Sequence, residues 1–309
     1  MKFYKPNFWK AKYYNIYSLI LLPISIIIQF LYFIQKGIIT PKKFNIPVIC
    51  VGNIYIGGTG KTPLTLELYN ILKSMNKNPA IVKKFYKNHY DELELIKQSV
   101  GNLFTNSSRQ KAMNEVQNKN FDVAILDDGY QDCSIKKDLK ILCFNEKQLI
   151  GNGHTIPSGP LREKLSSIKK SQIVVINGNE NKNFEKKLKK ISQNINIFYS
   201  KYIPEIPKEF KNKKFLAFAG IGNPENFFDT LREYGLKIIK SKIFPDHYSY
   251  RKNEIENLLD FANKNKLDLI TTEKDHYRLK KLGFNINYLT IKVQIEKKDK
   301  FEKLIKSHI

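Results

Sequence analysis

The sequence is poor in cysteine. It has three, Cys50, Cys133 and Cys143, and no two of them form a C-x-x-C pair. Two stand in apolar, strand-like runs, where a thiol behaves as a small hydrophobic side chain. We therefore expect no disulfide bonds and a reducing, cytoplasmic environment.

Acidic residues are also scarce, because 29 Asp and Glu face 53 Lys and Arg, which gives a formal net charge of +24. This charge favours an anionic partner, such as a nucleotide, a phosphorylated lipid, an acidic bilayer or a nucleic acid. The lysines are scattered along the chain, and no helix-turn-helix, RRM or zinc-finger signature accompanies them. We therefore expect no nucleic-acid partner.

Charge is absent altogether between Lys12 and Lys36, and residues 16–34 are almost all apolar. As a helix, the 23 uncharged residues would extend about 35 Å, enough to cross a hydrocarbon core of about 30 Å. No small-residue cleavage site follows, which disfavours a secretory signal. We predict that residues 1–36 form a membrane anchor, which either spans the bilayer or lies in its interface.

Among the glycines that are present, three gather in one loop. An apolar run at 46–51 precedes this loop and an amphipathic run at 64–72 follows it, the order strand, loop, helix. Glycine lets backbone N–H groups turn toward phosphate oxygens, and the positive end of the helix favours the same anion. We predict that Lys61 reaches the β- and γ-phosphates of ATP and that the Thr62 hydroxyl holds Mg²⁺. The predicted nucleotide site is Ile56, Gly57, Gly58, Thr59, Gly60, Lys61, Thr62 and Pro63.

This loop departs from the pattern G-x-x-x-x-G-K-[ST], because Tyr55 stands where the first glycine is expected. A variant loop of partitioning ATPases, K-G-G-x-G-K-[ST], carries a lysine where this chain has Ile56. That class is disfavoured, and a deviant phosphate loop is predicted.

A second candidate feature is the acidic end of an apolar run. Residues 121–126 read as a buried strand, which Asp127 and Asp128 follow directly. Carboxylates in this Walker-B position hold Mg²⁺ directly or through water. We predict that Asp127, Asp128 and Thr62 bind the metal.

Asp91 begins a helical pattern soon after a short strand predicted at 79–82. A carboxylate at the carboxyl edge of a parallel sheet is placed to act as a base beside a phosphate loop. Spacing alone, however, favours a helix N-cap for Asp91.

Strand and helix patterns alternate along the whole chain, which is typical of an α/β fold with a parallel sheet. Besides those above, strands are expected at 139–144, 173–176, 215–219, 238–244, 267–271 and 287–293. The segment 202–213, where prolines stand among charges, reads as a linker. We predict a P-loop domain at 37–201 and a smaller α/β domain at 202–309, after the anchor at 1–36.

Several blocks together resemble the tetraacyldisaccharide 4′-kinase family, which phosphorylates a lipid A precursor. They lie between about residue 45 and residue 280 and comprise 51–53 with 57–63, 127–131, 151–153 with 157–163, 218–224, 244–247 and 272–275. The combination is specific to this family, although no single block is.

The resemblance implies transfer of the ATP γ-phosphate to the 4′-hydroxyl of a tetraacyldisaccharide 1-phosphate. It places this reaction, which gives the 1,4′-bisphosphate, at the cytoplasmic face of the inner membrane. Asp91 and His247 match the family's catalytic pair, and Arg109 matches an arginine before the Walker-B strand. The blocks also imply that the glycolipid substrate is bound by Asn53, Gln131, Arg162 and Glu163.

Three departures from the family pattern affect these assignments. Residues 83–86 stand where the family has S-R-G-Y, and the segment between them and Asp91 is short. Residues 90–93 replace G-D-E-P, so that Glu92 is an alternative base. Asp132 replaces the histidine that ends D-D-G-F-Q-H.

An alternative class, a P-loop GTPase that acts as a switch or metal chaperone, would share Lys61, Thr62 and Asp127. Such a protein should carry N-K-x-D for guanine, whereas Lys274 and Asp275 are adjacent here. The sequence also has no C-x-C or His-rich metal tract. The kinase is therefore the leading prediction.

Overall fold

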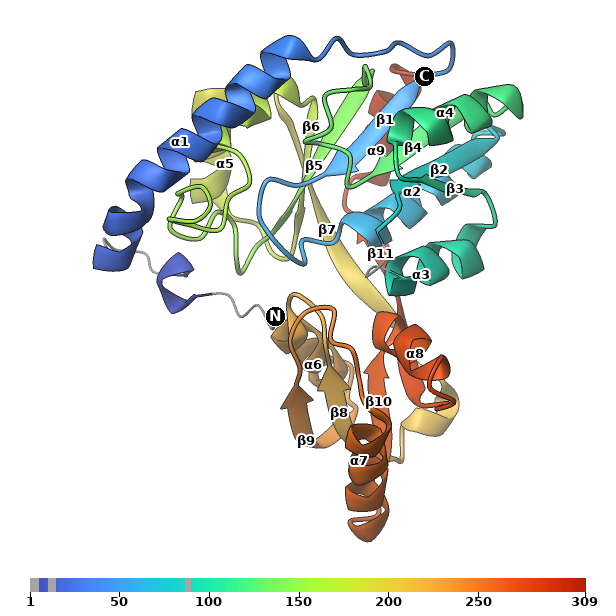
Figure 1. Cartoon of the computed structure of the whole chain (residues 1–309). Helices are drawn as coiled ribbons and strands as arrows, with labels where there is room; N and C mark the ends of the chain where they lie inside the picture. The colour runs from blue at the N-terminus through green and yellow to red at the C-terminus, as the bar shows by residue number, and fades with distance from the viewer. Residues whose placement is uncertain (1–5, 11–14, 87–89) are drawn as a thin grey trace. The chain divides into compact units, whose positions relative to one another are not determined.

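A computed structural model describes residues 6–10, 15–86 and 90–309 (Figure 1). These residues form two compact units, which are described one at a time. The large unit holds 6–10, 15–85, 102–201 and 294–309, and the small unit holds 86, 90–101 and 202–293. Of the predicted anchor, residues 1–5 and 11–14 lie outside the described part of the chain.

The large unit is a parallel sheet with helices. Its strands lie in the order β3-β2-β4-β1-β5-β6-β7, and all the pairs between β3 and β7 are parallel. The strands are β1 (Val48–Gly52), β2 (Pro79–Lys84), β3 (Leu103–Asn106), β4 (Val123–Asp127), β5 (Leu139–Asn145), β6 (Ile173–Asn177) and β7 (Asn196–Glu205), which continues into the small unit. The helices are α1 (Ile16–Ile38), α2 (Lys61–Ser74), α4 (Arg109–Asn118), α5 (Lys182–Ile191) and α9 (Lys298–Lys306), with 3-10 turns η1 (Asn7–Trp9) and η2 (Leu165–Lys170).

The small unit also has a parallel sheet, in the order β11-β10-β8-β9. Its elements are α3 (Tyr90–Val100), η3 (Lys208–Phe210), β8 (Lys214–Ala219), α6 (Pro224–Glu233), β9 (Lys237–Ile243), α7 (Lys252–Lys264), β10 (Asp268–Thr272), α8 (Glu273–Lys280) and β11 (Asn287–Ile295), whose last two residues belong to the large unit. The predicted α/β class with a parallel sheet is confirmed.

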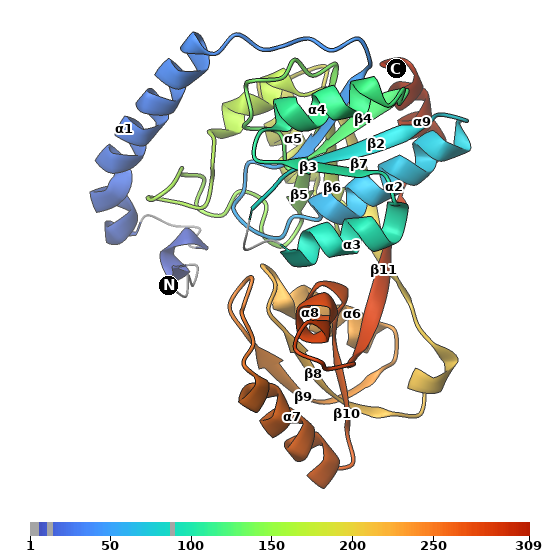
Figure 2. The same cartoon turned by 45° about the vertical axis from the view of Figure 1, so that its right-hand side comes forward.

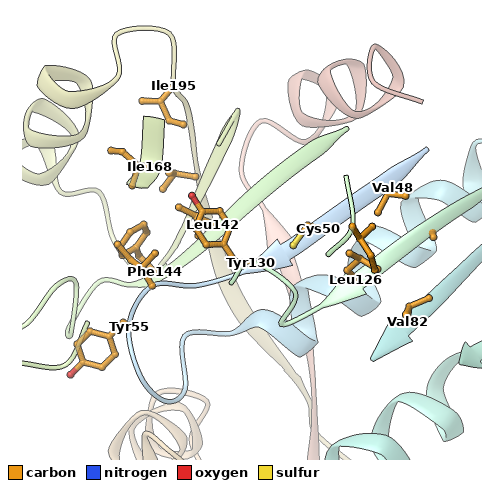
Figure 3. Close-up of a cluster of buried hydrophobic side chains, with 14 of the residues drawn as sticks. Val48, Cys50, Tyr55, Val82, Leu126, Tyr130, Leu142, Phe144, Ile168 and Ile195 are labelled. Carbon is orange, nitrogen blue, oxygen red and sulfur yellow. The ribbon is translucent and has the colours of Figure 1, made fainter. Parts of the chain in front are cut away.

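Apolar strands make the core of the large unit. All five residues of β1 and of β4 are buried, as expected for the central strands of a parallel sheet covered on both faces. Figure 3 shows side chains from these strands and their neighbours, among them Cys50, Leu126 and Phe144, gathered in one cluster. The two cysteines in this unit's strands therefore act as small apolar side chains.

The register of the strands brings polar residues together at one edge of this sheet. Asp127, the last residue of β4, lies beside Val51 of β1 and Lys83 of β2. Because the strands are parallel, the loops that follow them leave from the same edge, where sites in α/β folds form.

Residue 86 and residues 90–101 belong to the small unit, although they follow β2 of the large unit in the sequence. Their helix α3 forms ion pairs with α8, through Asp91 to Arg278 and Glu92 to Lys274. One change of unit falls at 201/202, within β7. The domain bounds 37–201 and 202–309 stay a prediction.

Helix α1 is long and apolar enough to cross a membrane, by length and composition. It runs along the outside of the large unit, next to the loop that follows β5 (Figures 1 and 2). Most of its large apolar side chains are exposed, including Ile27 and Leu31, each 59% exposed. This helix is therefore a candidate for association with a membrane.

Candidate active site

The glycine loop joins β1 to α2 in the conformation that an anion site needs. Gly57 and Gly60 have φ angles of 100° and 87°, which residues with a side chain rarely adopt. Gly60 is the N-cap of the 14-residue helix α2, and no acidic residue lies in the first helical turn. The free N–H groups and the positive end of this helix therefore fit a phosphate group.

The structure explains why Tyr55 can replace the first glycine of the pattern. Tyr55 forms an antiparallel bridge with Leu161, flanked by hydrogen bonds from Ile56 N to Pro160 O at 2.9 Å and from Arg162 N to Ile54 O at 2.6 Å. The backbone of Tyr55 is not left-handed, so glycine is not required there. The same pairing fixes Arg162 beside the phosphate loop.

Asn53 supports the loop from beneath. Its side chain is fully buried, and its Nδ2 donates to Tyr55 O at 2.6 Å and to Thr59 Oγ1 at 2.8 Å. Gln131 Nε2 in turn donates to Asn53 O at 2.8 Å. The Asn53 amide is buried among these contacts, which hold the shape of the loop.

Asp127 is buried at the end of β4 and is surrounded by donors. Its carboxylate accepts hydrogen bonds from Thr62 Oγ1 at 3.3 Å and Thr65 Oγ1 at 3.2 Å, and it forms an ion pair with Lys83. Sequence reasoning missed Thr65 and Lys83. The parallel pairing of β2 with β4 places Lys83 there, at the position where the family pattern has serine.

Asp128 faces cations. Its backbone is left-handed, with φ 54°, and its carboxylate accepts both contacts from Arg162 NH1, at 2.9 and 3.2 Å. Lys61 Nζ lies 3.7 Å from the same carboxylate. The three side chains predicted for Mg²⁺ are thus divided: Thr62 contacts Asp127, whereas Asp128 is paired with Arg162 and Lys61.

The Thr62–Asp127 pair fits a magnesium ion that is held mainly by nucleotide phosphates. Such an ion needs only one or two protein oxygens, because phosphates and water complete its octahedron. Within the described residues, no group of three or more His, Cys, Asp and Glu could form an all-protein metal site. The donor set therefore suits a metal that arrives with its nucleotide.

Arg109 holds the backbone of the acidic turn rather than its carboxylates. Its NH2 donates to Asp128 O at 2.7 Å and to Asp127 O at 3.3 Å. Its NH1 pairs with Asp132 at 3.2 Å, so the residue that replaces the family's histidine has a cationic partner. Burial opposes ionisation of Asp132, but hydrogen bonds from Ser134 and the charge of Arg109 lower its pKa.

In the small unit, Asp91 lies in the first turn of α3 and is 2% exposed. Arg278 NH2 donates to its Oδ2, and His247 Nδ1 lies 3.6 Å from its Oδ1. Burial opposes its ionisation, but hydrogen bonding with His247 and the charge of Arg278 lower the pKa of Asp91 well below its usual range. Asp91 is inside the helix, so it is not the N-cap that spacing alone favoured.

Arg278 is the centre of this second cluster, and sequence reasoning missed it. Its NH1 donates to Asp275 Oδ1 at 2.6 Å and to Gly220 O at 2.7 Å. Tyr250 OH and Thr272 Oγ1 also donate to Asp275, at 2.9 and 2.7 Å. Burial disfavours the guanidinium, but Asp275 and Asp91 raise its pKa. Its position three residues after Asp275, one helical turn on, is the signal that could have found it.

Glu92, the alternative base, is held by another cation. Lys274 Nζ donates to Glu92 Oε1 at 2.6 Å, and His247 Nε2 lies 3.9 Å from the same oxygen. The ring of His247 thus lies near both Asp91 and Glu92, and its backbone is left-handed, with φ 54°.

A parallel sheet, a glycine loop leading into a helix and a buried carboxylate on the neighbouring strand define a P-loop nucleotide-binding protein. More specifically, the chain belongs to the tetraacyldisaccharide-1-P 4′-kinase family, whose model matches residues 17–309. The resemblance found in the sequence is confirmed, and the chain is an ATP-dependent kinase of lipid A biosynthesis.

Relatives match almost the whole chain. It is 44% identical to the tetraacyldisaccharide 4′-kinase of Pelagibacter ubique, over 99% of this chain and 98% of that protein. It is 35% identical to that of Rickettsia canadensis, over 96% and 94%. Among solved structures, LpxK from Aquifex aeolicus in complex with ATP matches with a TM-score of 0.66 and 26% identity, covering 94% of this chain and 96% of that one. Family membership favours the kinase over the GTPase alternative.

Proposed function

We propose that this kinase transfers the γ-phosphate of ATP to the 4′-hydroxyl of a tetraacyldisaccharide 1-phosphate and releases the 1,4′-bisphosphate and ADP. The observation that carries this proposal is the large unit's cation-lined loop, where Lys61, Arg162 and the Thr62–Asp127 pair surround a helix N-terminus. The names of the relatives and the solved structure with ATP support the same substrates.

On the nucleotide side, residues 56–63 form the phosphate site, the N–H groups of residues 57–62 bind the phosphates, and Lys61 neutralises the charge that develops during transfer. Mg²⁺, when bound, would offset the charge of the phosphates, and Thr62 and Asp127 would hold it. Asp128 contributes by keeping Lys61 and Arg162 in place, 3.7 and 2.9 Å from its carboxylate. Lys61 can leave this long contact for a phosphate oxygen at small cost.

On the acceptor side, the 4′-hydroxyl oxygen bonds to the γ-phosphorus while the bond to the ADP oxygen breaks. The hydroxyl proton passes to the pair formed by Asp91 and His247. Phosphoryl transfer has a loose transition state, so even a weakly basic carboxylate suffices to accept this proton. Arg278 keeps Asp91 ionised and oriented, and Glu92 is the competing base.

For the glycolipid substrate, we propose that Arg162 supplies the main contact, since its side chain is partly exposed, at 28%. Gln131 accepts from Arg162 NH1 at 3.4 Å and would orient it. Asn53 and Glu163 are buried, and we propose that they support the site from within instead of touching the sugar.

We further propose that the enzyme acts at the cytoplasmic face of the inner membrane, where ATP and a lipid-linked sugar meet. Support comes from the exposed apolar side chains of α1 and from the net charge of +24, which attracts anionic headgroups.

The deciding experiment follows labelled γ-phosphate from ATP into a tetraacyldisaccharide 1-phosphate in detergent micelles, with labelled GTP as the comparison. Transfer from ATP to the 4′ position is expected. Absence of labelled lipid with a folded, ATP-binding protein would contradict the proposal.

Asp127→Asn should raise the Mg²⁺ concentration needed for half-maximal rate, and an unchanged requirement would remove Asp127 from the metal site.

A further inference from the structure

Five polar residues of α1 lie on one stripe. At 3.6 residues per turn they fall within about 60° of one another around the helix, while most of the remaining circumference is apolar. They are Ser18, Ser25, Gln29, Tyr32 and Lys36, and the other polar side chains, Tyr17 and Gln35, lie outside the stripe.

The N-terminal half of this stripe binds the loop after β5. Ser18 Oγ donates to Ser158 O at 2.7 Å, and Ser25 Oγ donates to Thr155 O at 2.9 Å. Both serines are buried, in a helix whose other side chains are mostly exposed. The polar side of α1 is therefore the side that packs on the protein.

The C-terminal half of the stripe reaches residues beside the phosphate loop. Gln29 Nε2 donates to Arg162 O at 3.2 Å, and Tyr32 OH donates to Gln131 O at 2.9 Å. Lys36 Nζ pairs with Glu163 at 2.8 Å, and both side chains are largely buried. Burial and the charge of Glu163 raise the pKa of Tyr32, so that its hydroxyl stays a donor.

These contacts continue to the predicted catalytic lysine. Arg162, held through its carbonyl by Gln29, places its guanidinium on Asp128 at 2.9 Å, and Asp128 lies 3.7 Å from Lys61. Gln131, held through its carbonyl by Tyr32, accepts from the same guanidinium at 3.4 Å. Two routes thus lead from α1 to Arg162.

From this geometry we propose that Gln29, Tyr32 and Lys36 are positioning residues for Arg162, so that the membrane helix is part of the catalytic machinery and not only a tether. The proposal rests on the proposed kinase function. A helix whose polar stripe is docked along its whole length lies in the bilayer interface, because crossing the bilayer would carry the polar loop 152–163 into the hydrocarbon. Lipid that surrounds the apolar outer face of α1 then keeps the helix docked on the protein, and the docked helix keeps Arg162 in position.

The test separates positioning from anchoring. In detergent micelles, where proximity to a bilayer no longer matters, the double variant Tyr32→Phe/Lys36→Met should lower kcat by about 10- to 100-fold, as displacement of a positioned group does. Its ATP KM and vesicle binding should stay near those of the wild type. Lys36→Arg, which keeps the ion pair, should recover most of the kcat that Lys36→Met loses.

The matched control is Ile27→Ser/Leu31→Ser on the opposite face of α1, where both side chains are exposed. This variant should bind vesicles of phosphatidylglycerol and phosphatidylethanolamine less well and keep the wild-type kcat in micelles. A thermal melt of each variant checks that the fold is intact.

A cycle with Arg162→Ala decides the outcome. If Tyr32 and Lys36 act through Arg162, their double variant should cost little further kcat in the Arg162→Ala background. An equal loss of kcat in both backgrounds, or wild-type kcat for the double variant, would overturn the proposal. Failure of the proposed function is a different result, in which the wild type itself transfers no phosphate to the lipid.

Discussion

Each of the two units has a cluster of charged side chains, but the balance between cations and carboxylates is opposite in the two. In the large unit, Asp127 and Asp128 face three cations, whereas in the small unit Asp91 and Asp275 share the single guanidinium of Arg278. A surplus of cations suits an anionic phosphate chain, whereas a carboxylate that its partners keep ionised is able to accept a proton. The difference is consistent with the roles proposed for the two clusters, phosphate binding for the first and proton acceptance for the second.

The clusters also differ in how the chain builds them. The phosphate loop is one contiguous stretch, so that local backbone geometry alone prepares it. The small unit's cluster is assembled from α3, from the turns after β8 and β9, and from α8, segments that are up to 187 residues apart. A cluster of this second kind depends on the tertiary fold for every contact.

The largest effect should come from removing the cation of the large unit that reaches the phosphates. Lys61→Ala should lower kcat by on the order of 10⁵-fold, the upper range for charges that stabilise phosphoryl transfer, and weaken ATP binding. Labelled γ-phosphate transfer measures the first and equilibrium dialysis the second. The exposed Lys77 of the same unit gives the control, Lys77→Ala. Turnover that survives Lys61→Ala would end the assignment.

The small unit is tested by a double-mutant cycle on its base. Asp91→Ala and His247→Ala should each lower kcat by roughly 10²- to 10⁴-fold with little change in ATP KM, which is the range for general-base catalysis. The double variant should be scarcely worse, because the two residues act together. If Asp91→Ala keeps near-normal kcat while Glu92→Ala does not, the base is Glu92.

The buried pair of Lys83 and Asp127 predicts a stability effect. Lys83→Met leaves a buried carboxylate with only hydroxyl partners and should lower the free energy of unfolding by about 3–5 kcal/mol. Lys83→Met/Asp127→Asn removes both charges and should recover most of this loss, as measured by urea unfolding. Lys84→Met on the same strand is the control. Equal losses in the single and double variants would show that the pair's charge is unimportant.

The smallest effect is in pH dependence. Because the pKa of Asp91 is lowered in the folded protein, its ionised form adds stability above the usual value of 3.8, and this contribution is lost as the pH falls. The difference in unfolding free energy between the wild type and Asp91→Asn should therefore be largest near neutral pH and shrink below about pH 4. Urea titrations from neutral to acidic pH measure it, and a difference that grows on acidification would reverse the sign assigned to Asp91.

Much of the fold followed from local patterns. Apolar runs at 121–126 and 139–144 predicted β4 and β5, because strands buried on both faces must be continuously apolar. By contrast, β3 and the long β7 carry mixed polar residues, half-buried or exposed at several positions, and no pattern singled them out. Parallel pairing with a neighbour, which the sequence does not encode locally, makes them strands.

Taken alone, the sequence determined the phosphate loop and the acidic strand end, since backbone freedom at glycine and burial of an apolar run act over a few residues. It also determined that residues 16–34 form an apolar segment whose full exposure to water is unfavourable. Only the tertiary structure decided that Lys83 meets Asp127, that Arg278 joins Asp91 to Asp275, and that the polar stripe of α1 faces the loop bearing Arg162. These contacts join residues that are between 3 and 187 positions apart in the sequence. Side chains on separate elements can meet only after the strand register and the helix orientation have been fixed.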